Sequence, residues 1–447
     1  MTNLKYLFFG LIVSIQSHAQ DFSRIQAEIE HFVPNDFMGS VLIAKEGEPI
    51  YSEFFGLSNI EEKEEVSESS IFRIASISKQ FTAAAILLLE ERGRLSIEDS
   101  VTDYVLNLPQ NLKQVSIFHL LTHTSGISDG IPNEAFNSDG DKLLELSEDQ
   151  LAEIELESNP GEIPRYNNAG YHLLGEVIES VSGLSYSEFV SKNILEPLQL
   201  QQTGFVSSIP DTLVNGYVLR DGALVMEPVL DSEILGPYSA GGMISTTKDL
   251  LTWINSLFNN SILTQPYVDK MTTPFKGGYA LGLQIQEENA RLRVFHVGAL
   301  FGAAASVSYY PNDNLSIIVL SNVNGRSGGG DAEVIAKSVE FLMFEDDVML
   351  QSERVEINLP VSILDDYVGE YVLPNGDEFV ISIEGEQLAM HLKGDTNSLS
   401  FYPASNTTFF TNMPFIRYEF IKDEGDKVTE LVVNQRGSTF TFKRETN

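Results

Sequence analysis

A serine and a lysine stand three residues apart at the start of an apolar segment. Ser76 and Lys79 precede an uninterrupted apolar run from Ala83 to Leu89, and Gly93 follows where a helix would end. Strong helix formers fill this run, so the pattern predicts a helix buried in the core of a large domain. Side chains three apart share a helix face, so we expect the hydroxyl and the amine side by side.

Such a pair suits nucleophilic catalysis. A serine hydroxyl becomes a good nucleophile when an adjacent base takes its proton, and a lysine is a base only when it is neutral. Burial and the positive end of the helix dipole both lower the pKa of a lysine at this position. The free N–H groups of the first turn point towards an anion developing on a substrate carbonyl. Ser-x-x-Lys also occurs by chance on solvated helix faces, so further groups are needed.

A second segment places a phenol and an amide before a helix. Prolines and asparagines in residues 164–170 predict a loop that leads into a helix over residues 171–181. Tyr166 and Asn168, two apart in an extended chain, project to the same side. The phenol could pass a proton to a leaving group, and the amide could hold a substrate amide. Alternatively, the segment is an ordinary helix entry in which Asn168 is the N-cap.

A third segment ends a predicted strand with His296, Val297 and Gly298. Glycine in a strand often marks a close approach, either of a ligand or of another part of the chain. The N–H group of Ala299, just beyond, could complete an oxyanion site with that of Ser76. The alternative is that His296 is a strand residue whose ring is satisfied by its neighbours.

Two other patterns suggest different chemistry. His119 and His123 could share a metal ion, but no third ligand stands near them, so we predict neither a metal nor a cofactor. Residues 325–329, Gly-Arg-Ser-Gly-Gly, fit the nucleophile elbow of α/β-hydrolases. That mechanism needs a later acid and a later histidine, and only His391 follows, so a glycine-rich surface loop is predicted there.

The start and the charge of the chain indicate its surroundings. Residues 1–19 carry Lys5, a short apolar span and small residues before Gln20, which predicts an export signal and a periplasmic or secreted protein. No later stretch is apolar for long enough to insert in a membrane. A formal charge of −36 repels phosphate backbones and argues against nucleic acid as a partner. The expected partner is a small-molecule or peptide-like substrate, and the sequence sets no oligomeric state.

The element pattern predicts an α+β domain followed by a small all-β unit. An early hairpin and a later four-stranded meander should form one antiparallel sheet, flanked by helices, with an inserted helical region after residue 126. Eight short strands near the end are what a small closed barrel requires. The expected organisation is a signal peptide (1–19), a hydrolase domain (20–345), a linker (346–361) and the eight-stranded β domain (362–447).

In their order, these motifs resemble those of the serine β-lactamase and penicillin-recognising hydrolase superfamily. Its class C-like branch includes D-Ala-D-Ala carboxypeptidases, D-aminopeptidases and related esterases, with the motifs Ser-x-x-Lys, Tyr-x-Asn and Lys-Thr-Gly or His-x-Gly. Residues 76–79, 166–168 and 296–298 match these motifs, and residues 120–127 and 241–246 are also typical of the branch. The resemblance covers roughly residues 25 to 345. The C-terminal segment is similar to lipocalin-like domains attached to some members.

The resemblance implies an acyl-enzyme mechanism. Ser76 would attack an ester or amide carbonyl, and Lys79 and Tyr166 would move protons. His123 would be structural. The residues implied in binding the substrate or the oxyanion are Asn168, His296, Gly298 and Ala299.

The third motif departs from that of many members. Val297 lacks the hydroxyl, and His296 lacks the permanent charge, that would hold a substrate carboxylate. An esterase or an amidase acting on a substrate without that carboxylate is therefore the expected activity. A D-Ala-D-Ala carboxypeptidase or β-lactamase is one alternative. A sensor that is acylated by penicillin or peptidoglycan fragments without turnover is another.

Overall fold

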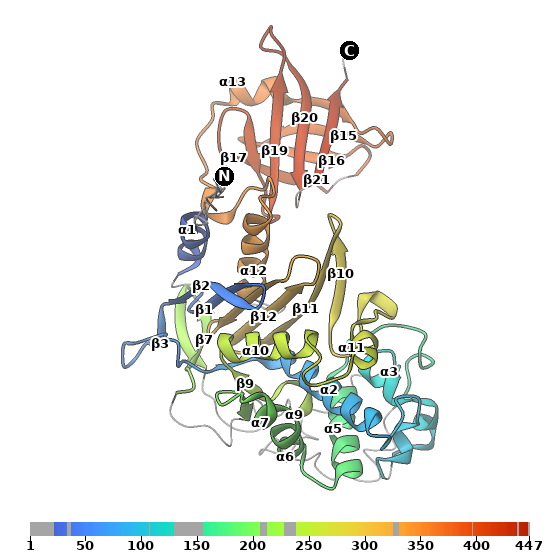
Figure 1. The fold of residues 1–447 in the computed structure, drawn as a ribbon. Coiled ribbons are helices and arrows are strands. Elements are labelled where there is room, and N and C mark those ends of the chain that lie inside the picture. The colour runs from blue at the N-terminus through green and yellow to red at the C-terminus, as the bar shows by residue number, and fades with distance from the viewer. Residues whose placement is uncertain are drawn as a thin grey trace, which may run out of the picture.

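A six-stranded antiparallel sheet forms the centre of the first domain (Figure 1). The computed structural model describes residues 22–33, 37–106, 108–128, 155–205, 212–227, 238–324, 330–395, 397–435 and 438–445. The predicted signal peptide, part of the inserted region and the loop 325–329 lie outside these ranges. The strand order is β10-β11-β12-β13-β1-β2. Its strands are β1 (Gly39–Lys45), β2 (Glu48–Phe55), β10 (Gln284–Glu288), β11 (Arg291–Leu300), β12 (Ala303–Tyr310) and β13 (Leu315–Ser321).

The early hairpin and the late meander join where β1 pairs with β13, with Val41 opposite Val319. This confirms the predicted mixed architecture. The first strand of the predicted meander is β10, which begins only at Gln284, and residues 276–278 before it form a 3-10 turn. Gly277 and Gly278 both have a positive φ there, which favours a turn over an extended strand.

Helices cover both faces of the sheet. On one face, α1 (Ser23–Phe32) and α12 (Gly330–Met343) pack against alternate residues of the central strands, such as Val41 and Val319. Leu42 and Leu320, which point the other way, belong to the larger core that contains α2 (Ser78–Glu91). The central strands are therefore apolar at successive positions, as strands buried on both faces must be.

The second face carries the core helix and the helices around it. Every residue of α2 from Ser78 to Leu89 is buried, as its lack of a polar face predicts. The helices on this side are α3 (Ile117–Leu121), α5 (Asn168–Ser182), α6 (Tyr186–Val190), α7 (Glu196–Leu198), α9 (Tyr238–Gly241), α10 (Thr247–Phe258) and α11 (Gln265–Thr272). The short strands are β3 (Leu57–Asn59), β4 (Glu64–Glu65), β5 (Phe72–Arg73), β6 (Gly204–Phe205), β7 (Gly216–Arg220), β8 (Ala223–Glu227) and β9 (Met243–Ser245).

The C-terminal part is a closed eight-stranded barrel that stands apart from the helical layer (Figure 1). Tyr371, Phe401, Phe409 and Phe420 fill its interior, and the short helix α13 (Val361–Leu364) precedes it. The strands are β14 (Gly369–Val372), β15 (Glu378–Glu384), β16 (Gln387–Leu392), β17 (Leu399–Pro403), β18 (Thr408–Phe410), β19 (Ile416–Lys422), β20 (Val428–Gln435) and β21 (Ser438–Arg444). The predicted eight-stranded barrel is therefore confirmed.

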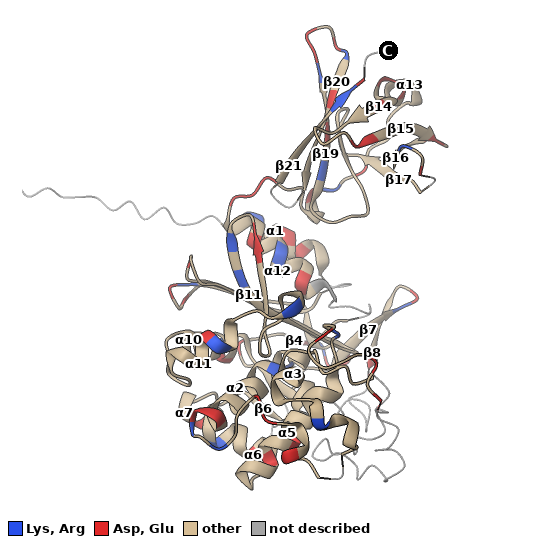
Figure 2. Ribbon diagram, turned by 90° about the vertical axis from the view of Figure 1, so that its right-hand side faces the viewer, with Lys and Arg blue, Asp and Glu red and all other residues tan. Residues whose placement is uncertain are grey.

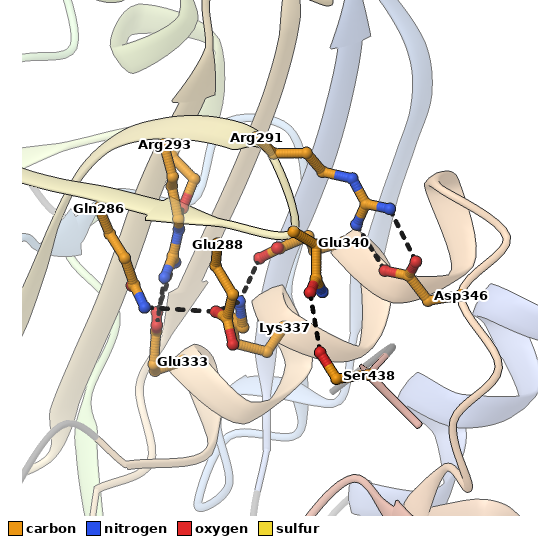
Figure 3. Close-up of polar contacts among 11 residues, drawn as sticks. Gln286, Glu288, Arg291, Arg293, Glu333, Lys337, Glu340, Asp346 and Ser438 are labelled. Carbon is orange, nitrogen blue, oxygen red and sulfur yellow. Dashed lines mark hydrogen bonds and ion pairs between the residues drawn. The ribbon is translucent and has the colours of Figure 1, made fainter. Parts of the chain in front are cut away.

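The two parts meet at a junction that is both apolar and charged. Phe341 of α12 packs against Phe415 of the barrel, with ring centroids 5.0 Å apart. Charged residues of both signs lie along α1 and α12 (Figure 2), and one cluster of them links the sheet to the connecting segment (Figure 3). Arg291 forms two hydrogen bonds with Asp346, at 2.5 and 2.7 Å. Among the described residues, no helix has the length and the apolar character that a membrane span requires.

Candidate active site

The turn that carries Ser76 lies between β5 and α2. Residues 75–77 form a 3-10 turn, so Ser76 comes just before the α-helix and not within its first turn as expected. Ala75 has a φ of 47°, which is uncommon for a residue with a side chain and is often found at functional sites. The Ser78 hydroxyl donates to the Ala75 carbonyl at 2.7 Å and accepts from the Met243 N–H at 3.1 Å. These two bonds hold the turn in this conformation.

Lys79 is fully buried and has three oxygen partners. Its Nζ lies 3.1 Å from Ser76 Oγ and donates to Asn168 Oδ1 at 2.8 Å and to the Ala240 carbonyl at 2.6 Å. All three partners are uncharged, so none offsets the loss of hydration of an ammonium group. Burial consequently lowers the pKa of Lys79 well below its usual value. This is the condition under which the amine can act as a base.

The Tyr166 hydroxyl meets the same serine from the other side. It donates to Ser76 Oγ at 2.8 Å, and the Tyr166 ring centroid lies 4.8 Å from Lys79 Nζ. Although 43% of the residue is exposed, desolvation of its hydroxyl raises the pKa of Tyr166 above the usual 10. The phenol is therefore neutral near neutral pH and can donate a proton.

Asn167, and not Asn168, is the N-cap of α5. The Asn167 side chain accepts from the Gly170 N–H at 2.9 Å, while Asn168 is the first residue of the helix. The alternative role for Asn168 as a cap is therefore wrong. Its Oδ1 accepts from Lys79, and its Nδ2 group could donate to a substrate carbonyl.

His296 is buried in β11 and does not present its ring to solvent. Its Nε2 lies 2.8 Å from the Tyr279 hydroxyl and its Nδ1 lies 2.7 Å from the Val297 carbonyl. A carbonyl only accepts, so Nδ1 carries the proton and Nε2 accepts from Tyr279. Burial, together with the Lys79 charge, lowers the pKa of His296 to about 3. The ring is therefore neutral, and it accepts a hydrogen bond from Tyr279, which is another residue of the site.

Gly298 lets β11 approach the turn that carries Ser76. A Cβ atom at this position would lie 2.3 Å from the Ile74 carbonyl oxygen and 3.1 Å from Ala75 Cβ. The close approach is thus made by another part of the chain, which was one of the two possibilities for this glycine. It brings the strand end that contains Ala299 to the Ser76 turn.

Three groups at the site escaped the sequence analysis. Tyr171 and Tyr279 form part of an aromatic cluster around His123, with ring centroids 5.0 and 4.5 Å from the histidine ring. The Ala240 carbonyl is the third. Ala240 directly precedes residues 241–246, which are typical of the hydrolase branch described above. That pattern is the one sequence signal that could have indicated the Ala240 carbonyl. Nothing local distinguishes the two tyrosines from ordinary core residues.

The two candidate metal-binding histidines serve separate loops. His119 Nδ1 accepts from the Ser116 N–H at 3.2 Å within the N-terminal cap of α3. His123 Nδ1 accepts from the Asn167 N–H at 3.1 Å. In each ring, Nδ1 therefore already accepts a hydrogen bond from a backbone N–H group.

Comparison with known proteins points to one family. Residues 36–340 match the family model described as Beta-lactamase, and residues 353–446 match a domain of unknown function (DUF3471). The chain is 28% identical over 431 residues to Penicillin-binding protein 4* of Bacillus subtilis (strain 168), covering 90% of this chain and 94% of that protein. It is 30% identical over 339 residues to Protein flp of Staphylococcus aureus (strain MW2), covering 71% of this chain and 65% of that protein.

Solved structures agree. A penicillin-binding protein homologue from Pyrococcus abyssi, described as octameric, matches with a TM-score of 0.65 at 28% identity, covering 95% of this chain and 100% of that one. The D-amino acid amidase from Ochrobactrum anthropi SV3 shares the fold, with a TM-score of 0.61 at 22% identity, over 72% of this chain and 98% of that one. Since the family model spans more than half of the sequence, this chain belongs to the Beta-lactamase family.

Proposed function

We propose that the protein is an exported serine hydrolase that forms a covalent acyl-enzyme on Ser76. One observation carries the proposal: Ser76 Oγ lies 3.1 Å from a buried lysine amine and 2.8 Å from a neutral phenol. Such an arrangement can take the proton of the nucleophile and deliver a proton to a leaving group. Export rests on the signal-like pattern of residues 1–19.

The contacts of Lys79 suggest how the proton moves. A neutral amine has two N–H bonds, which suffice for Asn168 Oδ1 and the Ala240 carbonyl, and one lone pair, which faces the Ser76 hydroxyl. As Ser76 Oγ bonds to the substrate carbonyl carbon, its proton passes to Lys79 Nζ. Tyr166 gives its own proton to the departing oxygen or nitrogen and regains one from Lys79. Water then adds to the acyl carbon and gives a proton to the same base. The bond between that carbon and Ser76 Oγ breaks, the base returns the proton to Ser76 Oγ, and the acid leaves.

The third motif supports a substrate without an anchoring carboxylate. His296 is neutral and both of its ring nitrogens are engaged, so it supplies no positive charge. Val297 has no hydroxyl to offer. Because the chain is similar to a D-amino acid amidase and to Penicillin-binding protein 4*, amides and β-lactams should also be tested as substrates. We therefore propose an ester or a peptide-like amide as the substrate class.

The test is a single panel of chromogenic substrates with a matched pair of variants. Wild-type protein is incubated with p-nitrophenyl esters, D-amino-acid p-nitroanilides and nitrocefin, and is also examined by intact mass for an acyl adduct. Ser76→Ala should abolish both turnover and the adduct, because the nucleophile is gone. Ser69→Ala, at an exposed serine seven residues earlier, should behave as wild type.

Two outcomes would contradict the proposal. Activity of Ser76→Ala close to wild type would end the assignment of the nucleophile. A single stoichiometric burst with every substrate, leaving a stable adduct, would instead indicate a sensor that is acylated without turnover.

A further inference from the structure

His123 occupies a position where helices usually end in glycine. The His123 N–H donates to the Leu120 carbonyl at 3.2 Å, and the Thr124 N–H donates to the His119 carbonyl at 2.8 Å. This pair of bonds is the Schellman ending of a helix, here α3, in which the residue after the cap is left-handed. The φ of His123 is 55°, a left-handed conformation that is uncommon for residues with a side chain, although asparagine, aspartate and histidine adopt it more often than the others. A need for the imidazole at this site would explain why glycine is not used.

The imidazole and the carbonyl of His123 hold the chain on both sides of Tyr166. The Arg165 N–H donates to the His123 carbonyl at 2.8 Å. The Asn167 N–H donates to His123 Nδ1 at 3.1 Å. One residue from the end of α3 therefore brackets the backbone of the tyrosine that meets Ser76.

The ring of His123 also supports the ring of Tyr166. The two ring centroids lie 4.2 Å apart, and His123 is 4% exposed whereas Tyr166 is 43% exposed. Tyr166 is thus held by His123 beneath it and is open on another side. Burial, with smaller effects of Lys79 and His296, lowers the pKa of His123 well below 6.5. The ring is therefore neutral, which leaves Nδ1 free to accept from Asn167.

We propose that His123 is a positioning residue that keeps the Tyr166 hydroxyl on Ser76 Oγ. The inference rests on the proposed function and goes beyond the structural role that the family resemblance implied. Proton transfer depends steeply on geometry, and a displacement of about 1 Å can cost about a hundredfold in rate. Without the imidazole, the loop loses the hydrogen bond at the Asn167 N–H and the ring against Tyr166, and Tyr166 is free to move away from the serine. The cap of α3 alone would need no imidazole.

The test compares two leaving groups in a double-mutant cycle. Hydrolysis of phenyl acetate needs the proton of Tyr166 more than hydrolysis of p-nitrophenyl acetate, because phenolate is the poorer leaving group. His123→Ala and Tyr166→Phe should each lower kcat/KM for phenyl acetate by about tenfold to a hundredfold, with a smaller loss for the nitrophenyl ester. The double variant should match Tyr166→Phe alone, since both changes remove the same interaction.

A conservative variant and a nearby control complete the design. His123→Asn keeps an acceptor for the Asn167 N–H and tolerates the left-handed conformation, so it should regain most of the activity lost in His123→Ala. His119→Ala removes a comparable bond to backbone in the same helix without touching Tyr166 and should leave both esters unaffected. Melting curves of each variant show whether it is folded.

The inference fails if His123→Ala lowers both esters equally, if its loss multiplies with that of Tyr166→Phe, or if His123→Asn regains nothing. Any of these results would indicate a role in folding alone. The proposed function is judged separately by Ser76→Ala, which must be inactive whichever way the His123 cycle turns out.

Discussion

At the scale of residues, the site depends on a lysine amine that is buried away from water and has no negatively charged partner in the described part of the chain. Lys79 is surrounded by a hydroxyl, an amide oxygen and a backbone carbonyl. These groups satisfy its hydrogen bonds, but they compensate its positive charge less than a carboxylate would. The same burial that favours the neutral amine therefore makes it available to Ser76.

This arrangement predicts a specific pH dependence. The rate of acylation should rise with pH as Lys79 loses its proton, with a midpoint well below the 10.5 of an ordinary lysine. No second limb is expected near pH 6.5, because burial lowers the pKa of His296 to about 3. Because the unfolded chain holds the Lys79 proton more tightly, its contribution to stability also rises with pH up to about 10.5. Stopped-flow measurement of p-nitrophenolate release tests the predicted profile of acylation rate. A range from about pH 5 to about pH 10 is wide enough to bracket a lowered lysine pKa.

Lys79→Ala is the control for that profile. It should lose about a hundredfold to ten-thousandfold in acylation rate, and the rising limb should disappear with it. A limb that persists in Lys79→Ala would assign the titration to another group.

At the scale of elements, the site exists because β11 and the Ser76 turn come into contact. The contact is possible only where β11 has no side chain, at Gly298. The N-terminus of α5 contributes in a different way. Its cap is Asn167, so the next residue, Asn168, can extend towards Lys79.

Gly298→Ala should therefore separate the strand from the turn. A methyl group 2.3 Å from the Ile74 oxygen cannot be accommodated without a backbone shift. We expect a loss of about 1 to 3 kcal/mol in unfolding free energy and at least about tenfold in acylation rate. Urea unfolding and the ester assay measure the two effects. Gly425→Ala, whose methyl would meet only a side-chain oxygen at 3.3 Å, is the matched control, and equal behaviour of the two variants would contradict the argument.

At the scale of the whole molecule, the barrel is attached by side-chain contacts as well as by the chain. Asp347 of the connecting segment accepts from Arg417 at 2.6 Å and from Asn434 at 3.2 Å, both on the barrel. At the tip of the β10–β11 hairpin, Ser438 donates to Asn289 at 3.1 Å. The strand that leads to His296 and Gly298 is thus in contact with the barrel at its other end.

Deleting residues 356–447 should lower stability more than it lowers activity. The deletion removes Phe415 and exposes Phe341, Val348 and Leu350, which now form one buried cluster. The catalytic groups all belong to residues before 300, so the rate of acylation should stay within about threefold of wild type if the domain remains folded. The melting temperature should fall by several degrees, since exposing a few large apolar side chains costs about 2 to 4 kcal/mol. An inactive but folded truncation would show that the barrel takes part in the chemistry.

Local sequence patterns determined much of this architecture. The apolar run after Lys79 specified a helix without a wet face, and the alternation of residues 362–447 specified eight short strands, because helix and strand periods are properties of neighbouring residues. The serine and the lysine are one turn apart for the same reason. The glycine of the third motif indicated a close approach, without identifying the partner.

What only the tertiary structure decided are the contacts between distant segments. The Ala240 carbonyl beside Lys79, the Tyr279 hydroxyl on His296 and the bracket of His123 around Tyr166 join residues that are 17 to 161 positions apart. No local period encodes such meetings, because they depend on how whole helices and strands pack. The left-handed conformation of His123, likewise, is set by where α3 has to end and not by the residue itself. Sequence therefore determined which groups could react, and packing decided their neighbours and their protonation.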